Sequence, residues 1–132
     1  MKAFHLQIAT PDGISFDGEA VSLLVRTVSG DVEILAGHTE LTASLATGRV
    51  RLKTESGERF ASASGGFLSV AGGEAILVAT TFEFKEDIDL ARAEAARDKT
   101  EELIKAEKDE KLLRGLEAKL ARAICRINVA KM

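Results

Sequence analysis

The sequence is poor in residues that form disulfides or bind transition metals. Its 132 residues include one cysteine, Cys125, and two histidines, His5 and His38. One cysteine excludes an internal disulfide framework, and so few soft ligands disfavour a zinc or copper site. We therefore expect neither a disulfide scaffold nor a transition-metal enzyme.

The chain also lacks an excess of basic charge and any long apolar run. It has 18 Lys and Arg against 21 Asp and Glu, a net charge of −3. Binding along nucleic acid needs clustered excess Lys and Arg. No run approaches the roughly 18 apolar residues that span a bilayer, and MKAFHLQIATPDG at the start lacks the apolar centre of a signal peptide. We expect a soluble, intracellular chain that binds no nucleic acid.

Turn-forming and aromatic residues are almost missing from the last third of the chain. All six Phe, the single Pro and ten of the eleven Gly lie in residues 1–84, whereas residues 85–132 are rich in Ala, Leu and charge and contain only Gly115. Tight turns need Gly and a sheet core needs bulky side chains, while Ala and Leu favour a helix. The composition predicts an α+β chain, with a β domain at residues 1–84 and a helical domain at residues 85–132.

The first segment reads as a series of short strands. Residues 2–9 alternate between apolar and polar side chains, Pro11 to Gly13 predicts a turn, and Gly-containing turns at residues 55–58 and 72–73 predict two hairpins. Many short strands with turns about every ten residues indicate a sandwich or a flattened barrel.

The second segment predicts two antiparallel helices. Asp87 is the expected N-cap of the first helix, and residues 105–110 are the expected turn. Apolar residues from Leu113 to Ala130 recur at spacings of three and four on the second helix. The bulky apolar side chains are too few to order a free-standing hairpin, so it needs a surface to lie on. It either stays docked on that surface or exchanges it for another.

Charge divides the two helices. Residues 85–110 carry six basic and ten acidic residues, whereas residues 111–132 carry six basic residues against Glu117 alone. The basic side chains either neutralise the acidic first helix or meet an acidic protein surface or a polyphosphate. The candidates for such a contact are Arg114, Lys119, Arg122 and Arg126.

Few residues indicate catalysis. His38 follows Gly37, but no Ser, Cys or second His lies near it in a nucleophile motif, which favours a structural or interface role. Gly65-Gly66 leads into a strand-like run and no GxxxxGK[ST] motif exists, so this pair predicts a turn in the sheet rather than a phosphate loop. We expect no enzyme activity.

The order of parts resembles the epsilon subunits of bacterial F-type rotary ATP synthases. The resemblance covers the whole chain and rests on residues 1–13, residues 30–38, Gly65 to Val70 and the run Ile88 to Ala93. It implies a ten-stranded β-sandwich followed by an antiparallel two-helix hairpin. It also implies a non-catalytic rotor subunit of a proton-translocating ATP synthase, held as a peripheral membrane protein at the cytoplasmic face of the bacterial cell membrane.

The resemblance implies partners for both segments. The sandwich is expected to bind the gamma subunit of the central stalk and to touch the c-ring, with Asp31 and His38 near that contact. Glu33 and Ala36 depart from the Gly and Pro that the family usually has there. The hairpin is expected either to fold down on the sandwich or to extend along gamma towards the catalytic beta and alpha subunits. In the extended position it is expected to restrain ATP hydrolysis, with the basic residues of the last helix against an acidic loop.

Some members of this family bind ATP on the hairpin, as a regulatory ligand rather than a required cofactor. The matching residues here are Glu83, Ile88, Asp89, Arg92, Ala93, Arg122 and Arg126, and Lys99 stands where tighter-binding relatives carry Arg. Arginine offers paired donors to phosphate oxygens, whereas lysine is a point charge. Two alternatives stay open: Asp89 simply caps a helix and pairs with an arginine, or the chain is a free-standing ATP sensor. A hydrolase that uses His38 is disfavoured.

Overall fold

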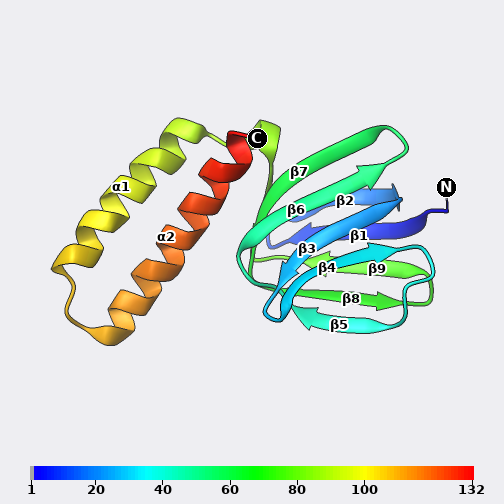
Figure 1. Cartoon of the computed structure of the whole chain (residues 1–132), viewed down its shortest axis with the longest axis horizontal. Helices are drawn as coiled ribbons and strands as arrows, with labels where there is room; N and C mark the ends of the chain where they lie inside the picture. Colours follow the sequence, from blue (N-terminus) through cyan, green and yellow to red (C-terminus); the bar gives the residue numbers. More distant parts are fainter. Residues whose placement is uncertain (1) are drawn as a thin grey trace.

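The computed structural model describes residues 2–132, which form two five-stranded sheets packed face to face and a pair of helices at one end (Figure 1). One sheet has the order β2 (Gly13–Ala20), β1 (Phe4–Thr10), β9 (Glu74–Val78), β8 (Phe67–Ala71) and β5 (Leu41–Ser44). The other has the order β10 (Thr81–Phe84), β7 (Gly57–Ser64), β6 (Gly48–Thr54), β3 (Ser22–Thr27) and β4 (Gly30–Leu35). The expected ten-stranded sandwich is confirmed.

Alternating side chains fill the space between the sheets. Leu6 and Ile8 of β1 are fully buried, as are Leu23 of β3 and Leu52 of β6. Because successive side chains of a strand point to opposite faces, the alternation in the sequence becomes one buried face per sheet. All paired strands are antiparallel except β1 and β9, which run parallel.

The glycine pair at residues 65–66 carries the chain from one sheet to the other. Gly65 and Gly66 have φ of +71° and +90°, in the left-handed region that favours glycine. A Cβ on Gly66 would lie 1.8 Å from the carbonyl oxygen of Val78. The pair is therefore a structural turn, as the sequence predicts.

The two hairpins expected at residues 55–58 and 72–73 are present, as the β6–β7 and β8–β9 connections. Among the strands that the sequence analysis does not single out are β2 and β5. Both are edge strands of the same sheet, and both carry many exposed side chains.

The first helix begins later than the sequence predicts. Residues Lys85–Asp87 form a short 3₁₀ turn, η1, and Ile88 is extended, so α1 (Leu90–Ala106) starts after Asp89. Asp89 is the N-cap, and its carboxylate accepts a hydrogen bond of 3.1 Å from the Arg92 amide. The prediction that Asp87 caps this helix is wrong, because the 3₁₀ turn uses that residue.

The connection between the helices is also shorter than expected, because α2 (Glu110–Ala130) begins only four residues after α1 ends. Asp109 caps α2 by accepting hydrogen bonds from the Lys111 and Leu112 amides. Capping by Asp109 places Glu110 in α2, and α1 continues through Lys105 to Ala106, although both residues were expected in the turn.

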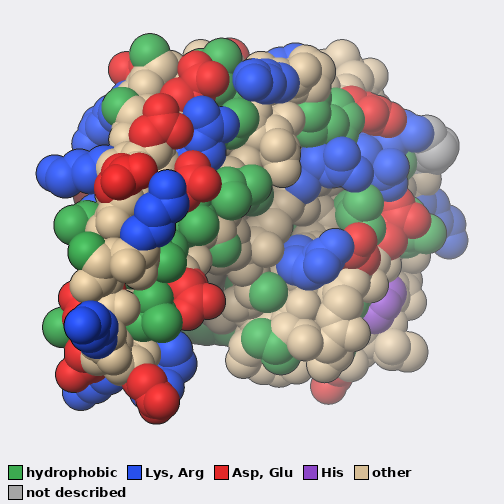
Figure 2. Space-filling model, turned by 60° about the vertical axis from the view of Figure 1, so that its left-hand side comes forward, with side chains coloured by type: hydrophobic (Ala, Val, Ile, Leu, Met, Phe, Trp, Pro, Cys, Tyr) green, Lys and Arg blue, Asp and Glu red, His purple; other side chains and the backbone are tan. Residues whose placement is uncertain are grey.

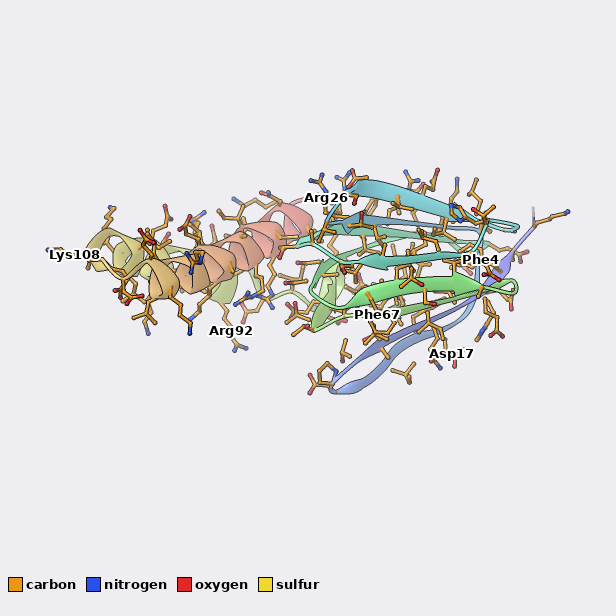
Figure 3. The ribbon with its side chains drawn as sticks, turned by 90° about the horizontal axis from the view of Figure 1, so that it is seen from below. Phe4, Asp17, Arg26, Phe67, Arg92 and Lys108 are labelled. Carbon is orange, nitrogen blue, oxygen red and sulfur yellow. The ribbon has the colours of Figure 1, made fainter. Side chains whose placement is uncertain are left out.

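The hairpin contacts the sandwich through one end only. α1 and α2 lie side by side, and the C-terminal part of α2 rests against β7, β6 and η1 (Figure 1). Lys108 marks the opposite end, far from the sheets (Figure 3). Exposure follows the same gradient along α2: Leu112 is 59% exposed, whereas Ile127 is 5% and Val129 is 1% exposed.

Candidate functional site

The linker between the two domains is clamped to the sandwich by Arg59 of β7. Its guanidinium lies 3.5 Å from the centre of the Phe84 ring and donates a hydrogen bond of 2.5 Å to Glu86. The Arg59 guanidinium holds the pKa of the Glu86 carboxyl below its usual range. Phe82 packs edge-on against Phe84, with ring centres 5.0 Å apart. These contacts fix the point from which the hairpin departs.

Three polar contacts join α2 and the end of the chain to the sandwich side. Arg126 donates a hydrogen bond of 2.6 Å to Glu83 of β10, and the Ser62 hydroxyl of β7 donates one of 3.2 Å to the Cys125 sulfur. Lys85 donates to the carbonyl oxygen of Met132. Together with the burial of Ile127 and Val129, these contacts define the docked position of the hairpin.

A cavity of about 430 Å³ lies where α1, α2 and the linker meet, and we call it the hairpin cavity. Its lining residues come from four elements in sequence order: β10, η1, α1 with its N-cap, and α2. They are Glu83, Asp87, Asp89, Arg92, Ala93, Ala96, Lys119, Ala123 and Arg126. The alanines leave the space open, because larger side chains at these positions would fill it.

The lining combines both signs of charge. It has three acidic and three basic residues, of which Glu83 and Arg126 are paired with each other. Within residues 2–132, Arg92 and Lys119 have no ion pair. Their charges can bind an anionic group, while the carboxylates of Asp87 and Asp89 can accept hydrogen bonds from hydroxyl or amino groups. The cavity therefore suits a ligand that carries both an anion and such donors.

The structure brings together most of the residues that the sequence suggests for ATP. Glu83, Asp89, Arg92, Ala93 and Arg126 all line the hairpin cavity. Three others, Ile88, Lys99 and Arg122, are not among its lining residues. Lys99 is exposed on α1, and Arg122 is half-buried on α2.

Sequence reasoning missed three lining residues, Asp87, Ala96 and Ala123, and assigned Lys119 to a different contact. Helical spacing is the signal that could have found the two alanines, whereas Asp87 lies in η1, before the helix. Ala96 lies one turn after Ala93, and Ala123 lies one turn after Lys119 and just before Arg126 on the same face. Small residues at these positions mark the open side of each helix.

The residues expected at a partner contact of the sandwich lie near the two ends of β4. Asp31 is at the start of β4, where it accepts a hydrogen bond of 2.7 Å from Arg26, and His38 follows the end of the strand. β4 is an edge strand, so a partner touching both residues would lie along its whole length. Glu33, between them, forms an ion pair of 2.5 Å with Arg51.

The basic residues of the last helix fall into two groups. Arg114 and Lys119 are exposed, while Arg122 and Arg126 are half-buried. Arg126 is already engaged by Glu83. The hairpin surface seen in Figure 2 mixes acidic and basic side chains, and a hollow separates its lower part from the sandwich.

Other kinds of site find little support in the described chain. No cluster of three metal-binding side chains occurs in residues 2–132. The lining of the hairpin cavity includes no Ser, Thr, Cys or His that could act as a nucleophile or base. Neither α1 nor α2 has the length and apolar character needed to cross a bilayer.

Comparison with known families divides the chain close to the linker. Residues 3–85 match the family described as the β-sandwich domain of the ATP synthase delta/epsilon chain. Residues 86–131 match the long α-helix domain of the same chain.

Individual relatives agree along nearly the whole length. The chain is 38% identical over 130 residues to the ATP synthase epsilon chain of Bacillus velezensis, covering 98% of each chain. It is 41% identical to the ATP synthase epsilon chain of Pediococcus pentosaceus, covering 96% of this chain and 94% of that one. A chain of the Euglena gracilis mitochondrial ATP synthase, in a structure of OSCP, F1 and the c-ring, has the same fold, with a TM-score of 0.84 at 22% identity. That match covers 98% of this chain and 82% of the other.

Proposed function

This chain belongs to the ATP synthase delta/epsilon family, and from that membership we propose that it is a non-catalytic rotor subunit of a proton-translocating ATP synthase. In this proposal the sandwich binds the gamma subunit and the c-ring and transmits rotation. The hairpin restrains ATP hydrolysis when it leaves the sandwich for the catalytic subunits. The subunit lies at the cytoplasmic face of the membrane, held there by the complex.

The observation that carries the regulatory part is the one-ended docking of the hairpin. The sandwich has its own core, and α2 contacts it only through the last turns. An element with few buried contacts opens at a low free-energy cost compared with global unfolding. The hairpin can therefore leave while the sandwich remains folded and bound to the rotor.

Arg126 can form an ion pair in either the docked or the extended position of the hairpin. In the docked hairpin its guanidinium is bound to Glu83, at 2.6 Å. An acidic loop of a catalytic subunit would offer an alternative carboxylate to the same side chain, together with Arg114, Lys119 and Arg122. Loss of the Glu83 partner should favour the extended, inhibitory position.

We further propose that ATP in the hairpin cavity favours the docked position. The cavity is lined by both helices and by Glu83 and Asp87 from the sandwich side, so a ligand there contacts every part that must separate. A ligand that binds one state only stabilises that state in proportion to its concentration. The same cavity supports the second candidate function, a free-standing ATP sensor that needs no complex.

Reconstitution separates these functions. The purified chain is mixed with a catalytic core that contains gamma and is passed over a sizing column. Co-elution is expected for the rotor subunit, and failure to co-elute would leave the free-standing sensor. Deletion of residues 86–132 should raise ATP hydrolysis by the complex, and unchanged hydrolysis would remove the inhibitory role of the hairpin alone.

Point variants test the exchange of Arg126. Glu83→Gln should increase inhibition of hydrolysis, because it frees Arg126. Arg126→Gln should destabilise the hairpin in both the docked and the extended position. Titration of the isolated chain with ATP should show weaker binding for Arg92→Ala and Arg126→Ala. Arg114→Ala is the matched control, since it removes an exposed arginine of α2 that does not line the cavity. ATP binding unaffected by the first two changes would exclude this cavity as the site.

A further inference from the structure

A second hollow of about 520 Å³ lies on the other side of α2, and we call it the α2 groove. Ala121, Ile124 and Asn128 line it from the helix. These positions are offset by about two residues from Lys119, Ala123 and Arg126, which line the hairpin cavity. Two residues correspond to about 200° around an α-helix, so the two sets lie on opposite sides of α2. In Figure 3, Arg26 lies on the sandwich above the C-terminal end of α2, and Arg92 lies below the hairpin.

The sandwich wall of the groove is built around Arg26. A Cβ on Gly48 of β6 would lie 2.4 Å from the Cβ of Arg26, so glycine is required for the stem of this arginine to lie where it does. Its Nε donates to Asp31 at 2.7 Å, which fixes the head of the side chain. The guanidinium still has its terminal amino groups available as donors.

The side chains that line the groove carry surplus positive charge. It is lined by Arg26, Arg49 and Asp31, and the carboxylate is already engaged by Arg26. Arg49 is exposed and takes part in no ion pair or side-chain hydrogen bond among residues 2–132. Its charge is complementary to an anion.

Apolar surface lies beside these arginines. Leu24 of β3 and Val129 of α2 line the groove, and Ile124 and Met132 on its helix side are 41% and 42% exposed. Large apolar side chains left open next to unpaired positive charge favour a ligand that is apolar at one end and anionic at the other. The volume also falls within the range of about 300–1,000 Å³ typical of small-molecule sites.

We propose that the α2 groove binds a small amphipathic anion, with its carboxylate or phosphate at Arg49 and Arg26 and its apolar body against Leu24 and Ile124. The occupant touches the sandwich and the hairpin at once, so its binding strengthens docking of α2. This site is separate from the hairpin cavity and does not depend on the function proposed above.

The test uses the isolated full chain, labelled for amide NMR, with octanoate and octyl phosphate as probes. Short alkyl chains are chosen because they remain monomeric at millimolar concentration. We expect saturable shifts on both walls of the groove, at Thr47 and Gly48 of β6 and at Ala121, Ile124 and Asn128 of α2. The two probes distinguish a carboxylate ligand from a phosphate ligand. Amide shifts confined to one wall of the groove, or to the outer face of the sheet that contains β1, β2, β5, β8 and β9, would overturn the proposal.

Variants and matched ligands separate this site from general apolar binding. Arg49→Gln should weaken binding about tenfold, since a charge-assisted contact is lost. Ala121→Trp should abolish binding by filling the groove from an exposed position. Arg114→Gln, on the exposed part of α2, should leave the affinity unchanged. Octylammonium keeps the apolar tail but lacks the anionic head, and acetate keeps the anionic head but lacks the tail. Each should bind at least tenfold more weakly than octanoate.

Each of these variants changes an exposed residue, and its amide spectrum checks that it folds. Equal binding of octanoate and octylammonium, or equal affinity in Arg49→Gln, would overturn the proposal. Because no partner subunit is present, either result leaves the rotor function untouched.

Discussion

The sandwich and the hairpin bury their apolar side chains to different extents. The main core cluster lies entirely between Phe4 and Phe84, with several Leu and Ile side chains fully buried. The hairpin buries mainly small residues and keeps Leu103, Leu112 and Ile124 more than 40% exposed. A domain with its own core is stable by itself, whereas an element with half-exposed leucines depends on where it docks.

Gly66→Ala should have the largest effect, because the sandwich has no room at this position. The added Cβ would meet the Val78 carbonyl oxygen, and φ is positive, so we expect a loss of about 4 kcal/mol in the free energy of unfolding. Denaturant unfolding measures it. Gly57→Ala is the control, since its φ is also positive but nothing lies near its added Cβ. Equal losses in the two variants would mean that the clash contributes nothing.

Leucine truncation compares the two cores directly. Leu52→Ala, at a fully buried site of β6, should cost about 3 kcal/mol in the free energy of unfolding. Leu112→Ala, at a site that is 59% exposed on α2, should cost about 0.5 kcal/mol or less. Similar losses for both changes would show that the tip of the hairpin is buried more deeply than the structure indicates.

Arg126→Ala should loosen the docked end of the hairpin without unfolding the sandwich. The pair with Glu83 is about one-third exposed, so its loss is expected to cost about 1 kcal/mol or less. The half-buried Cys125 beside Ser62 reports undocking through its reaction with a thiol reagent, which should become up to roughly fivefold faster. In Arg114→Ala the rate of Cys125 modification should stay at the wild-type value. An equal increase in that variant would show that the Arg126–Glu83 pair does not hold the hairpin in place.

Gly115→Ala should act in the opposite direction to Gly66→Ala. Gly115 lies in α2, its φ is not in the left-handed region, and an added Cβ meets nothing within 4 Å. Alanine is preferred over glycine in a helix interior by about 0.8–1.0 kcal/mol. Amide hydrogen exchange in α2 should therefore slow, and faster exchange would show that this position needs the flexibility of glycine.

The smallest effect is expected from pH at the outer face of the sandwich. His5 lies 2.6 Å from Asp17, and both side chains are at least 40% exposed. The Asp17 carboxylate raises the pKa of His5, and the His5 ring lowers the pKa of Asp17. The contribution of His5 is complete below its unfolded pKa of about 6.5 and disappears as pH rises through the raised value. That of Asp17 is complete above about 3.9 and disappears as pH falls through the lowered value.

The pair should therefore stabilise the sandwich most between about pH 4 and 6.5. In Asp17→Asn an NMR titration should show the pKa of His5 falling towards its ordinary value. Gln7→Ala removes only the weaker hydrogen-bond partner of Asp17 and should change the pKa of His5 less. No change in the Asp17 variant would contradict the role of this pair.

The parts of the fold that the sequence predicts well are those where burial imposes a period. The alternation of Phe4, Leu6 and Ile8 corresponds to a buried face. The spacing from Leu113 to Ala130 corresponds to a face of α2 that is half-buried at first and buried at Ala123 and Ile127. β2 and β5 were missed because edge strands need no second neighbour and tolerate exposed side chains, as Ile14 at 57% exposure shows. Composition alone could not reveal them.

The candidate site was predictable only in part for a related reason. The motif around Asp89 and Arg92 is local in the sequence and could be read there. Whether Arg122 or Lys119 joins them depends on the rotation of α2 against α1, which packing decides. The N-cap was misplaced because residues 85–87 form η1, where Glu86 is bound by Arg59, a residue distant in the sequence from the linker.

The parallel pairing of β1 with β9 gives the chain an order of assembly during synthesis. His5 is the partner of Glu74 in the sheet, so the sandwich cannot close until residues 74–78 have left the ribosome. Non-local β folds form within milliseconds to seconds. At about 5–20 residues per second, residues 85–132 need roughly 2–10 s more to be made. We therefore expect the sandwich to close at about the time that α2 is completed, so that the newly made hairpin meets a finished surface.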